Sequence, residues 1–148
     1  MTGTLFEAAE YAARLAAVRD RMDGRGIDLL LLSAPENIVY LTGLDHWGYF
    51  APHVLVVPRD GGPVLVTRAM ERVTVAAQVT GARFEGHSDA ESAADGVLRA
   101  VAGLRFARVG IEAWSSGLPH GLAEALKAGL PNTAWTDASG LVDGLRLL

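Results

Sequence analysis

The chain has 148 residues, of which 50% are hydrophobic, so it can bury one sizeable core. Its formal net charge is −4, and no basic cluster occurs, which argues against nucleic acid or an anionic membrane as a partner. The absence of cysteine excludes disulfides, thiol chemistry and cysteine-bound zinc. Because the N-terminal residues lack a signal-peptide pattern and no apolar run reaches the length of a membrane span, we expect a cytoplasmic protein with a single domain over residues 1–148.

The first half of the chain begins with a helix pattern and continues with strand patterns. Apolar residues at spacings of three and four predict an amphipathic helix over residues 6–23, which Gly24 and Gly26 end. The aliphatic run over residues 27–32 is typical of a strand that is covered on both faces. Two further strands are expected over residues 53–57 and 64–67, and the intervening PRDGGP predicts a hairpin.

The second half repeats a rhythm of helix and strand. We expect a helix over residues 69–79, an extended segment over 82–86, and a capping box from Ser88 to Glu91 ahead of the next helix. Residues 108–112 predict a strand, Pro119 begins a helix that Gly129 ends, and Asp137 is expected to cap a last helix over residues 138–147. The pattern predicts an α/β fold of three layers (α/β/α) around a mixed sheet of five or six strands.

Several other motifs have simpler structural explanations. The Gly24-Arg25-Gly26 run lies after a helix and before a strand, the reverse of the order in a dinucleotide loop, so it is interpreted as a helix stop. The two serines after the strand over residues 108–112 lack the frame of a nucleophile elbow. The histidines are scattered without metal-ligand spacing. They are His46, His53, His87 and His120.

The stretch PENIVYLTGLDHWGYF, residues 35–50, combines a structural first half with a second half that is rich in functional groups. Pro35 can begin a short helical turn, Asn37 can hydrogen-bond the nearby backbone, and Gly43 can end the turn in a left-handed conformation. Ile38 and Leu41, three residues apart, would then face the core. We therefore expect the first half of the stretch to be structural and to set the direction in which the second half leaves it.

The order of these segments resembles the N-terminal domain of the creatinase, prolidase and aminopeptidase P family, over about residues 11–148. The resemblance rests on the helix, the strand GIDLLLLS, the motif PENIVYLTG, the hairpin VLVVPRDGGPVLVT and the final DASGLVDGLRLL. Its most specific residues are Asn37, Tyr40, Leu41, Thr42 and Gly43 in the first motif, and Asp137, Leu141, Val142, Leu145 and Arg146 in the second.

The resemblance implies a ribonuclease H-like domain without a catalytic site of its own. Members of the family carry a second, larger pita-bread domain that binds two divalent metal ions (Mn, Co or Zn) through two Asp, one His and two Glu, or works without metal in creatinase. That domain is absent from the 148 residues, so we expect no cofactor, metal site or catalytic residue in this segment. Its own C-terminal catalytic domain is the expected partner, and the exposed-looking Leu145, Leu147 and Leu148 suggest that something further packs there.

In the family, this domain helps to build a dimer or tetramer, and the loop after the LTG motif reaches the active site of a neighbouring subunit. The candidate pocket residues here are Asp45, His46, Trp47, Tyr49 and Phe50. The aromatic side chains would form walls for a small or proline-like group, while Asp45 and His46 would meet a charged end of the substrate. The simpler alternative is that the aromatic side chains cover the edge of the sheet.

The resemblance predicts a domain that positions substrate and supports homodimer formation in a hydrolase of Xaa-Pro dipeptides, creatine or ectoine-like amides. Arg146 near the end of the last helix is expected to complement the helix dipole and to pair with an acidic group across the domain interface. An alternative of another class is a stand-alone module that binds a small molecule or a protein. A third alternative, an autonomous hydrolase that uses Ser116 and His120, lacks the context of a catalytic triad.

Overall fold

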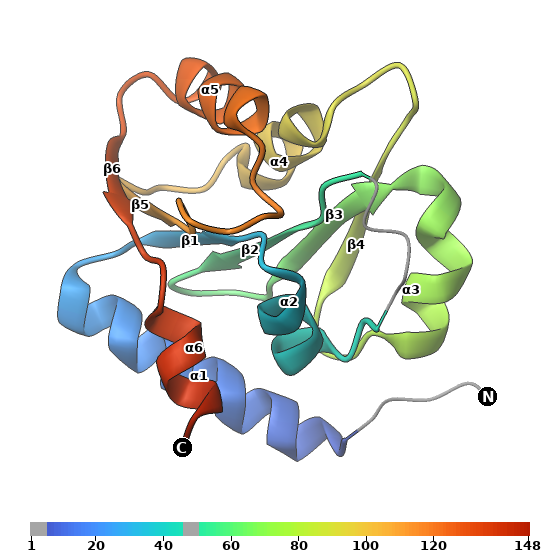
Figure 1. The fold of residues 1–148 in the computed structure, drawn as a ribbon, viewed down its shortest axis with the longest axis vertical. Helices are drawn as coiled ribbons and strands as arrows, with labels where there is room; N and C mark the ends of the chain where they lie inside the picture. Colours follow the sequence, from blue (N-terminus) through green and yellow to red (C-terminus); the bar gives the residue numbers. More distant parts are fainter. Residues whose placement is uncertain (1–5, 46–50) are drawn as a thin grey trace.

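The chain forms one mixed sheet whose two faces are covered by helices (Figure 1). The computed structural model describes residues 6–45 and 51–148. The strands are β1 (Leu29–Leu32), β2 (Val54–Pro58), β3 (Val64–Arg68), β4 (Arg83–His87), β5 (Arg108–Ile111) and β6 (Ala134–Asp137). The helices are α1 (Ala8–Arg25), α2 (Pro35–Thr42), α3 (Arg72–Gln78), α4 (Ala93–Val101), α5 (His120–Gly129) and α6 (Leu141–Arg146), with a short 3-10 turn, η1 (Ala69–Glu71), before α3.

The six strands follow the order β4-β3-β2-β1-β5-β6. The pairs β3–β4, β1–β5 and β5–β6 are parallel, whereas β2 is antiparallel to both of its neighbours. Five strands therefore run in one direction and β2 alone runs against them. The predicted hairpin is confirmed, because β2 and β3 pair with Val56 opposite Val64 across the PRDGGP turn. The predicted α/β class and mixed sheet are confirmed as well.

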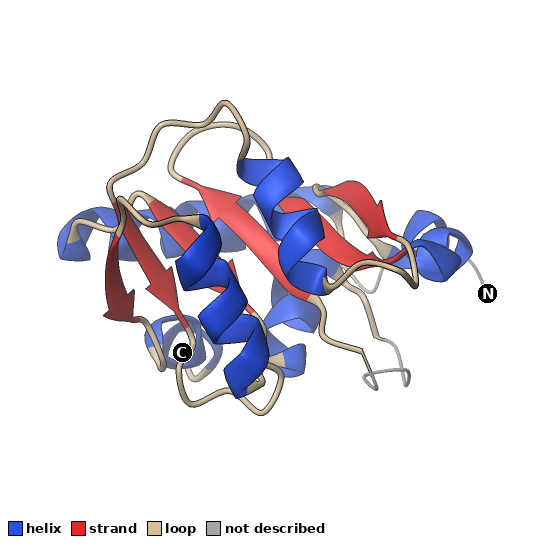
Figure 2. Ribbon diagram, turned by 90° about the horizontal axis from the view of Figure 1, so that it is seen from above, coloured by secondary structure: helices blue, strands red, loops and turns tan. Residues whose placement is uncertain are grey.

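Side chains of successive strand residues enter two separate cores, one on each face of the sheet. Leu30 and Leu32 of β1 pack with α1, α2 and α6, whereas Leu29 and Leu31 pack with α4 and α5. This explains why the run over residues 29–32 is aliphatic throughout, since both faces of the strand are covered. Figure 2 shows α4 and α5 crossing one face of the sheet.

Some predicted helix boundaries were wrong. The capping box before α4 is formed by Ser92 and Asp95, and the Ser88 N–H donates to Glu91 in a turn that precedes it. The first helix continues through Gly24 and ends at Gly26, which adopts φ 67°. Local sequence alone cannot choose between two Ser-x-x-acid patterns four residues apart, and the packing of α4 on the sheet decides which one begins the helix. Among the described residues, no helix is long and apolar enough to cross a bilayer.

Candidate functional site

The carboxyl ends of five strands meet at one edge of the sheet, and buried polar side chains gather there. In open α/β sheets this edge is where ligands bind. Ser33 follows β1 and Glu112 follows β5, Thr67 and His87 lie near the ends of β3 and β4, and His53 precedes the antiparallel β2. All five residues are at least nine-tenths buried.

Glu112 is the centre of a hydrogen-bonded group of side chains at this edge. It is 3% exposed, and its Oε1 accepts hydrogen bonds from the backbone N–H groups of Ser33 at 2.8 Å and Ala34 at 2.9 Å. Its Oε2 accepts from Nδ2 of Asn37 at 2.5 Å. Two chain segments that are far apart in sequence are therefore joined by one buried carboxylate.

Burial raises the pKa of the Glu112 carboxyl above its ordinary value, and the negative charge of Asp143 raises it further. The hydrogen bonds from Ala34, Ser33 and Asn37 act in the opposite direction, because they stabilise the ionised form. Burial is the largest of these effects. A buried carboxyl with a raised pKa in a chain of hydrogen bonds marks a functional-site candidate.

The structure corrects the role that was predicted for Asn37. Its side chain does not bind the nearby backbone. Nδ2 donates to Glu112 and, at 2.7 Å, to Oδ1 of Asp143, while Oδ1 accepts from Nε of Arg146 at 2.9 Å. The amide therefore joins β5 to α6. Arg146 does lie in the last turn of α6, and the groups it binds in this structure are Asn37 and Asp143, both within this domain.

Asp137 was predicted to cap α6, but it does not. The helix begins at Leu141 after Gly140, which has φ 86° and offers no side-chain cap. Oδ1 of Asp137 accepts instead from the N–H groups of Ser139 at 2.9 Å and Ala113 at 3.3 Å. This carboxylate therefore stabilises the turn between β6 and α6 and ties it to the segment after β5. Its hydrogen bonds from Ser139 lower the pKa of Asp137.

The rest of the PENIVYLTG motif has the structural role that was predicted. Pro35 begins α2, Ile38 and Leu41 lie in the core, and Gly43 ends the helix with φ 83°. The Thr42 hydroxyl donates to the Ile38 carbonyl at 2.7 Å. Tyr40 supports α1, because its carbonyl accepts from Nη1 of Arg14 at 2.7 Å and its ring lies 4.2 Å from the guanidinium carbon.

The candidate pocket loop begins directly after this helix. Asp45 is exposed, and its N–H donates to Oε1 of Gln78 at 2.9 Å. The other predicted pocket residues lie outside the described residues, so their role stays a prediction. They are His46, Trp47, Tyr49 and Phe50.

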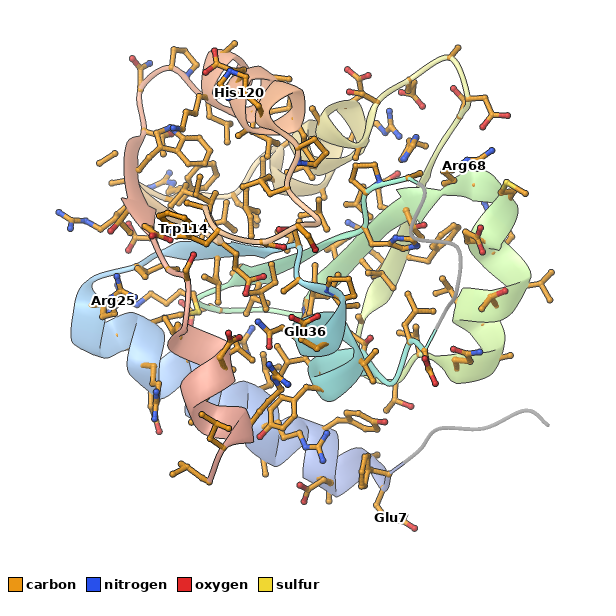
Figure 3. All side chains as sticks on the ribbon, in the orientation of Figure 1. Glu7, Arg25, Glu36, Arg68, Trp114 and His120 are labelled. Carbon is orange, nitrogen blue, oxygen red and sulfur yellow. The ribbon has the colours of Figure 1, made fainter. Side chains whose placement is uncertain are left out.

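Ala51 and Pro52, the first described residues after Asp45, line a cavity of about 600 Å³. Arg68 and His87 line the same cavity. This volume falls within the range of small-molecule sites. Figure 3 shows Arg68, one of the residues that line this cavity, above α3. Nδ1 of His87 lies 3.1 Å from the Ser88 carbonyl, which can only accept, so this nitrogen carries a hydrogen.

Ser116 and His120, which an autonomous hydrolase would use, do not form a catalytic relay. His120 lies at the start of α5 (Figure 3). Its imidazole is 90% exposed, and Nε2 lies 3.7 Å from Glu124 on the same helix. The Ser115 hydroxyl accepts from the N–H of Gly117 at 3.0 Å. In the described part of the chain, no hydrogen bond joins Ser116 to His120, and no group of three or more His, Asp or Glu residues is arranged to hold a metal ion.

Sequence reasoning missed Glu112 and Asp143 as members of the site. Glu112 was seen only as the last residue of the strand RVGIE, and Asp143 was not singled out. A signal was present, because an acidic residue directly after a buried strand lies at the carboxyl edge, where polar groups are rarely needed for packing. The partners of Glu112 could not be identified from the sequence, because they lie 75 to 79 residues away from it.

Comparison with known proteins identifies the family. Residues 14–148 match the model of the creatinase/prolidase N-terminal domain. A hydrolase/peptidase designated y4tM from Sinorhizobium fredii is 31% identical over 97% of this chain and 39% of its own length. The ectoine hydrolase of Halomonas elongata is 41% identical over 45% of this chain and 16% of its own length. The chain thus spans well under half the length of these curated relatives.

Solved structures of low identity share the fold. A proline dipeptidase from Streptococcus pneumoniae superposes with a TM-score of 0.79 at 23% identity, covering 90% of this chain and 97% of that one. The Xaa-Pro dipeptidase from Bacillus anthracis superposes with a TM-score of 0.77 at 21% identity, covering 93% of this chain but 36% of that one. Because the family model matches nearly the whole sequence, the chain belongs to the creatinase/prolidase N-terminal domain family.

Proposed function

We propose that this chain is the non-catalytic N-terminal domain of a larger cytoplasmic hydrolase, in which it supports a homodimer and forms part of the substrate pocket of the neighbouring subunit. The family match over residues 14–148 carries the proposal. The relatives support it: y4tM is a hydrolase/peptidase, and the domain is about a third of the Bacillus anthracis Xaa-Pro dipeptidase. One structural relative is the N-terminal domain of a cytoplasmic peptidase.

Within this proposal, α2 directs the loop that follows Gly43 toward substrate. The helix is held at its start by Glu112 and ends against Tyr11 and Gln78, so the loop leaves from a defined point. The cavity beside Ala51 and Pro52 lies where the chain re-enters β2. Rigid elements that carry a variable loop are a common arrangement for recognition sites.

The chemistry is assigned to a second domain, because the described residues do not fit a metal site. Two divalent ions (Mn, Co or Zn), if the enzyme uses them, would be held by that domain, and no step is assigned to them in this segment. The substrate is proposed to be an Xaa-Pro peptide. The 41% identity to ectoine hydrolase over 66 residues favours a cyclic or small amide as a second candidate.

The first test is to sequence the gene past the codon for Leu148 and to express any continuous reading frame. The longer protein and residues 1–148 alone would be assayed on Ala-Pro, creatine and ectoine, with and without added Mn²⁺, Co²⁺ or Zn²⁺. We expect hydrolysis by the longer protein only. Metal-free turnover by residues 1–148, abolished by Ser116→Ala, would overturn the proposal in favour of an autonomous hydrolase. A stop codon directly after Leu148 would favour the binding module.

The pocket role of the loop has its own test in the longer enzyme. Trp47→Ala should raise KM or change the preference between Ala-Pro and ectoine while metal content stays constant. Trp114→Ala is the matched control, because Trp114 follows β5 at the place marked in Figure 3 and is exposed to 86% of its surface. Identical kinetics for Trp47→Ala and the parent on every substrate would contradict the pocket role. Light scattering of both lengths tests the homodimer.

A further inference from the structure

The start of α2 is held by a side chain from another strand. The N–H groups of Ser33 and Ala34, which immediately precede the helix, both donate to Oε1 of Glu112. Glu112 directly follows β5, and β5 pairs in parallel with β1, the strand before α2. The position of this carboxylate is therefore set by the sheet, and it fixes the turn that begins the helix.

The same carboxylate is connected to α6 through Asn37. The two hydrogens of Nδ2 are divided between Glu112 at 2.5 Å and Asp143 at 2.7 Å, and the amide oxygen accepts from Arg146 at 2.9 Å. Asn37 is fully buried, so water cannot replace these partners. The six-residue α6 is thus tied to α2 at two positions one turn apart, in addition to its apolar contacts.

The other end of α2 is equally confined. A Cβ on Gly43 would lie 2.6 Å from the Tyr11 hydroxyl and 3.0 Å from the Gln78 carbonyl oxygen. Two residues later the N–H of Asp45 donates to the Gln78 side chain. Because Gly43 lies in close contact with Tyr11 and Gln78, a movement of α2 changes the point from which the following loop departs.

We propose that Glu112 is a positioning residue that couples the orientation of α6 to the point where the loop after Gly43 leaves α2. The coupling itself is between segments of this chain and does not depend on the proposed function. Its consequence, that the arrangement at α6 sets the position of a substrate-binding loop, rests on the proposed function above. Asn37 lies in the first turn of α2 and Gly43 at its end. Among the described residues, Glu112 is the side chain that bonds both the turn before α2 and the Asn37 amide, which in turn bonds α6.

Titration of Glu112 provides the means to observe this coupling. The charged groups near it come from α6, where Asp143 and Arg146 share Asn37. The segment between β1 and α2 offers the Ser33 and Ala34 N–H groups, and α2 offers the Asn37 amide. Protonation places a hydrogen on one carboxyl oxygen and weakens it as an acceptor for Asn37 or for the Ser33 and Ala34 N–H groups. The hydrogen bonds from Glu112 to the turn before α2 and to the Asn37 amide, which bonds α6, would then change together.

The test is a pH titration of ¹H–¹⁵N spectra of the full chain between pH 4 and pH 8. We expect three groups of signals to shift with one common midpoint: the Ser33 and Ala34 amides, the Gly43 and Asp45 amides, and the amides of α6. Glu112→Gln should abolish the common shift. Glu124→Gln, an exposed glutamate on α5, should leave it unchanged.

A second variant keeps the proposal testable if Glu112→Gln does not fold. The double variant Asp143→Ala/Arg146→Ala removes both α6 partners of the Asn37 amide and should uncouple the α6 amides from the titration, while Ser33, Ala34, Gly43 and Asp45 still shift together. The proposal is overturned if, in the parent chain, only Ser33 and Ala34 titrate and the Gly43, Asp45 and α6 signals stay constant. None of these readouts involves catalysis, so failure of the coupling is distinguishable from failure of the proposed enzyme function.

Discussion

Asn37 and Glu112 lie 75 residues apart in the sequence, and their side chains are joined by a 2.5 Å hydrogen bond at the carboxyl edge of the sheet. The bond connects the motif PENIVYLTG to the end of β5, and through Asp143 and Arg146 it extends to α6. The two motifs that carry the family resemblance are therefore parts of one hydrogen-bond network, which is buried at Asn37 and Glu112 and partly exposed at Asp143 and Arg146. This explains why an amide is found at position 37, since it must donate twice and accept once.

Replacement of Asn37 by Asp should destabilise the fold strongly at neutral pH. The change removes both donors and brings a third carboxylate between Glu112 and Asp143, so we expect a loss of about 3 kcal/mol in the free energy of unfolding. Urea denaturation followed by circular dichroism measures it. Asn132→Asp, on an exposed turn, is the control and should stay within about 0.5 kcal/mol of the parent. Equal stability of the two variants would contradict the network.

The raised pKa of Glu112 predicts how its contribution to stability changes with pH. Because the unfolded carboxyl ionises near its ordinary value of 4.5 and the folded one only at higher pH, the folded state binds more protons between these two values. The contribution of Glu112 is thus fully present below the unfolded value and is lost as pH rises through the folded value. We expect the unfolding free energy of the parent to fall relative to Glu112→Gln across this window. If the unfolding free energy of the parent instead rose relative to that of Glu112→Gln as the pH increased, the raised pKa of Glu112 would be contradicted.

Asp28 should show the opposite pH dependence. Its Oδ2 accepts from the N–H groups of Arg108 and Ala107, both at 2.9 Å, and these bonds lower the pKa of Asp28. Its contribution is present above the ordinary value of 3.8 and is lost as pH falls through the folded value. Asp28→Ala should cost about 1–2 kcal/mol at pH 7, and the difference from the parent should narrow in acid.

The exposed Asp60 provides the control for this prediction. Asp60→Ala should have little effect on the unfolding free energy at either pH. A loss in Asp28→Ala that is equally large at pH 7 and below pH 3 would show that the charge of Asp28 is not involved. Thermal unfolding at matched ionic strength gives both comparisons.

Gly117 is required because of a close backbone approach. A Cβ at this position would lie 2.0 Å from the Ser33 carbonyl oxygen, and a backbone atom cannot move aside as a flexible side chain can. Gly117→Ala should therefore cost about 2 kcal/mol or more. Gly121→Ala in α5 is the control, because nothing lies within 4 Å of its Cβ position and alanine favours a helix. Similar melting temperatures for the two variants would contradict this prediction.

Much of the architecture was predictable because it depends on local patterns. The run over residues 27–32 contains the buried β1, the PRDGGP turn lies between β2 and β3, and Gly43 ends α2 with a positive φ. Each of these features follows from a periodicity or from the conformational range of a few neighbouring residues. The helix boundary before α4 was missed because Ser88 and Ser92 both precede an acidic residue by three positions.

The sequence by itself determined the α/β class, the mixed sheet, the family and the segment that begins the candidate loop. Only the tertiary structure decided what Asn37, Asp137 and Arg146 bind, and it alone brought Glu112 into the site. The physical reason is that a buried carboxylate requires donors, and the donors here come from residues 75 to 79 positions away. Pairing of β1 with β5 brings them together, and no local pattern in the chain records that pairing.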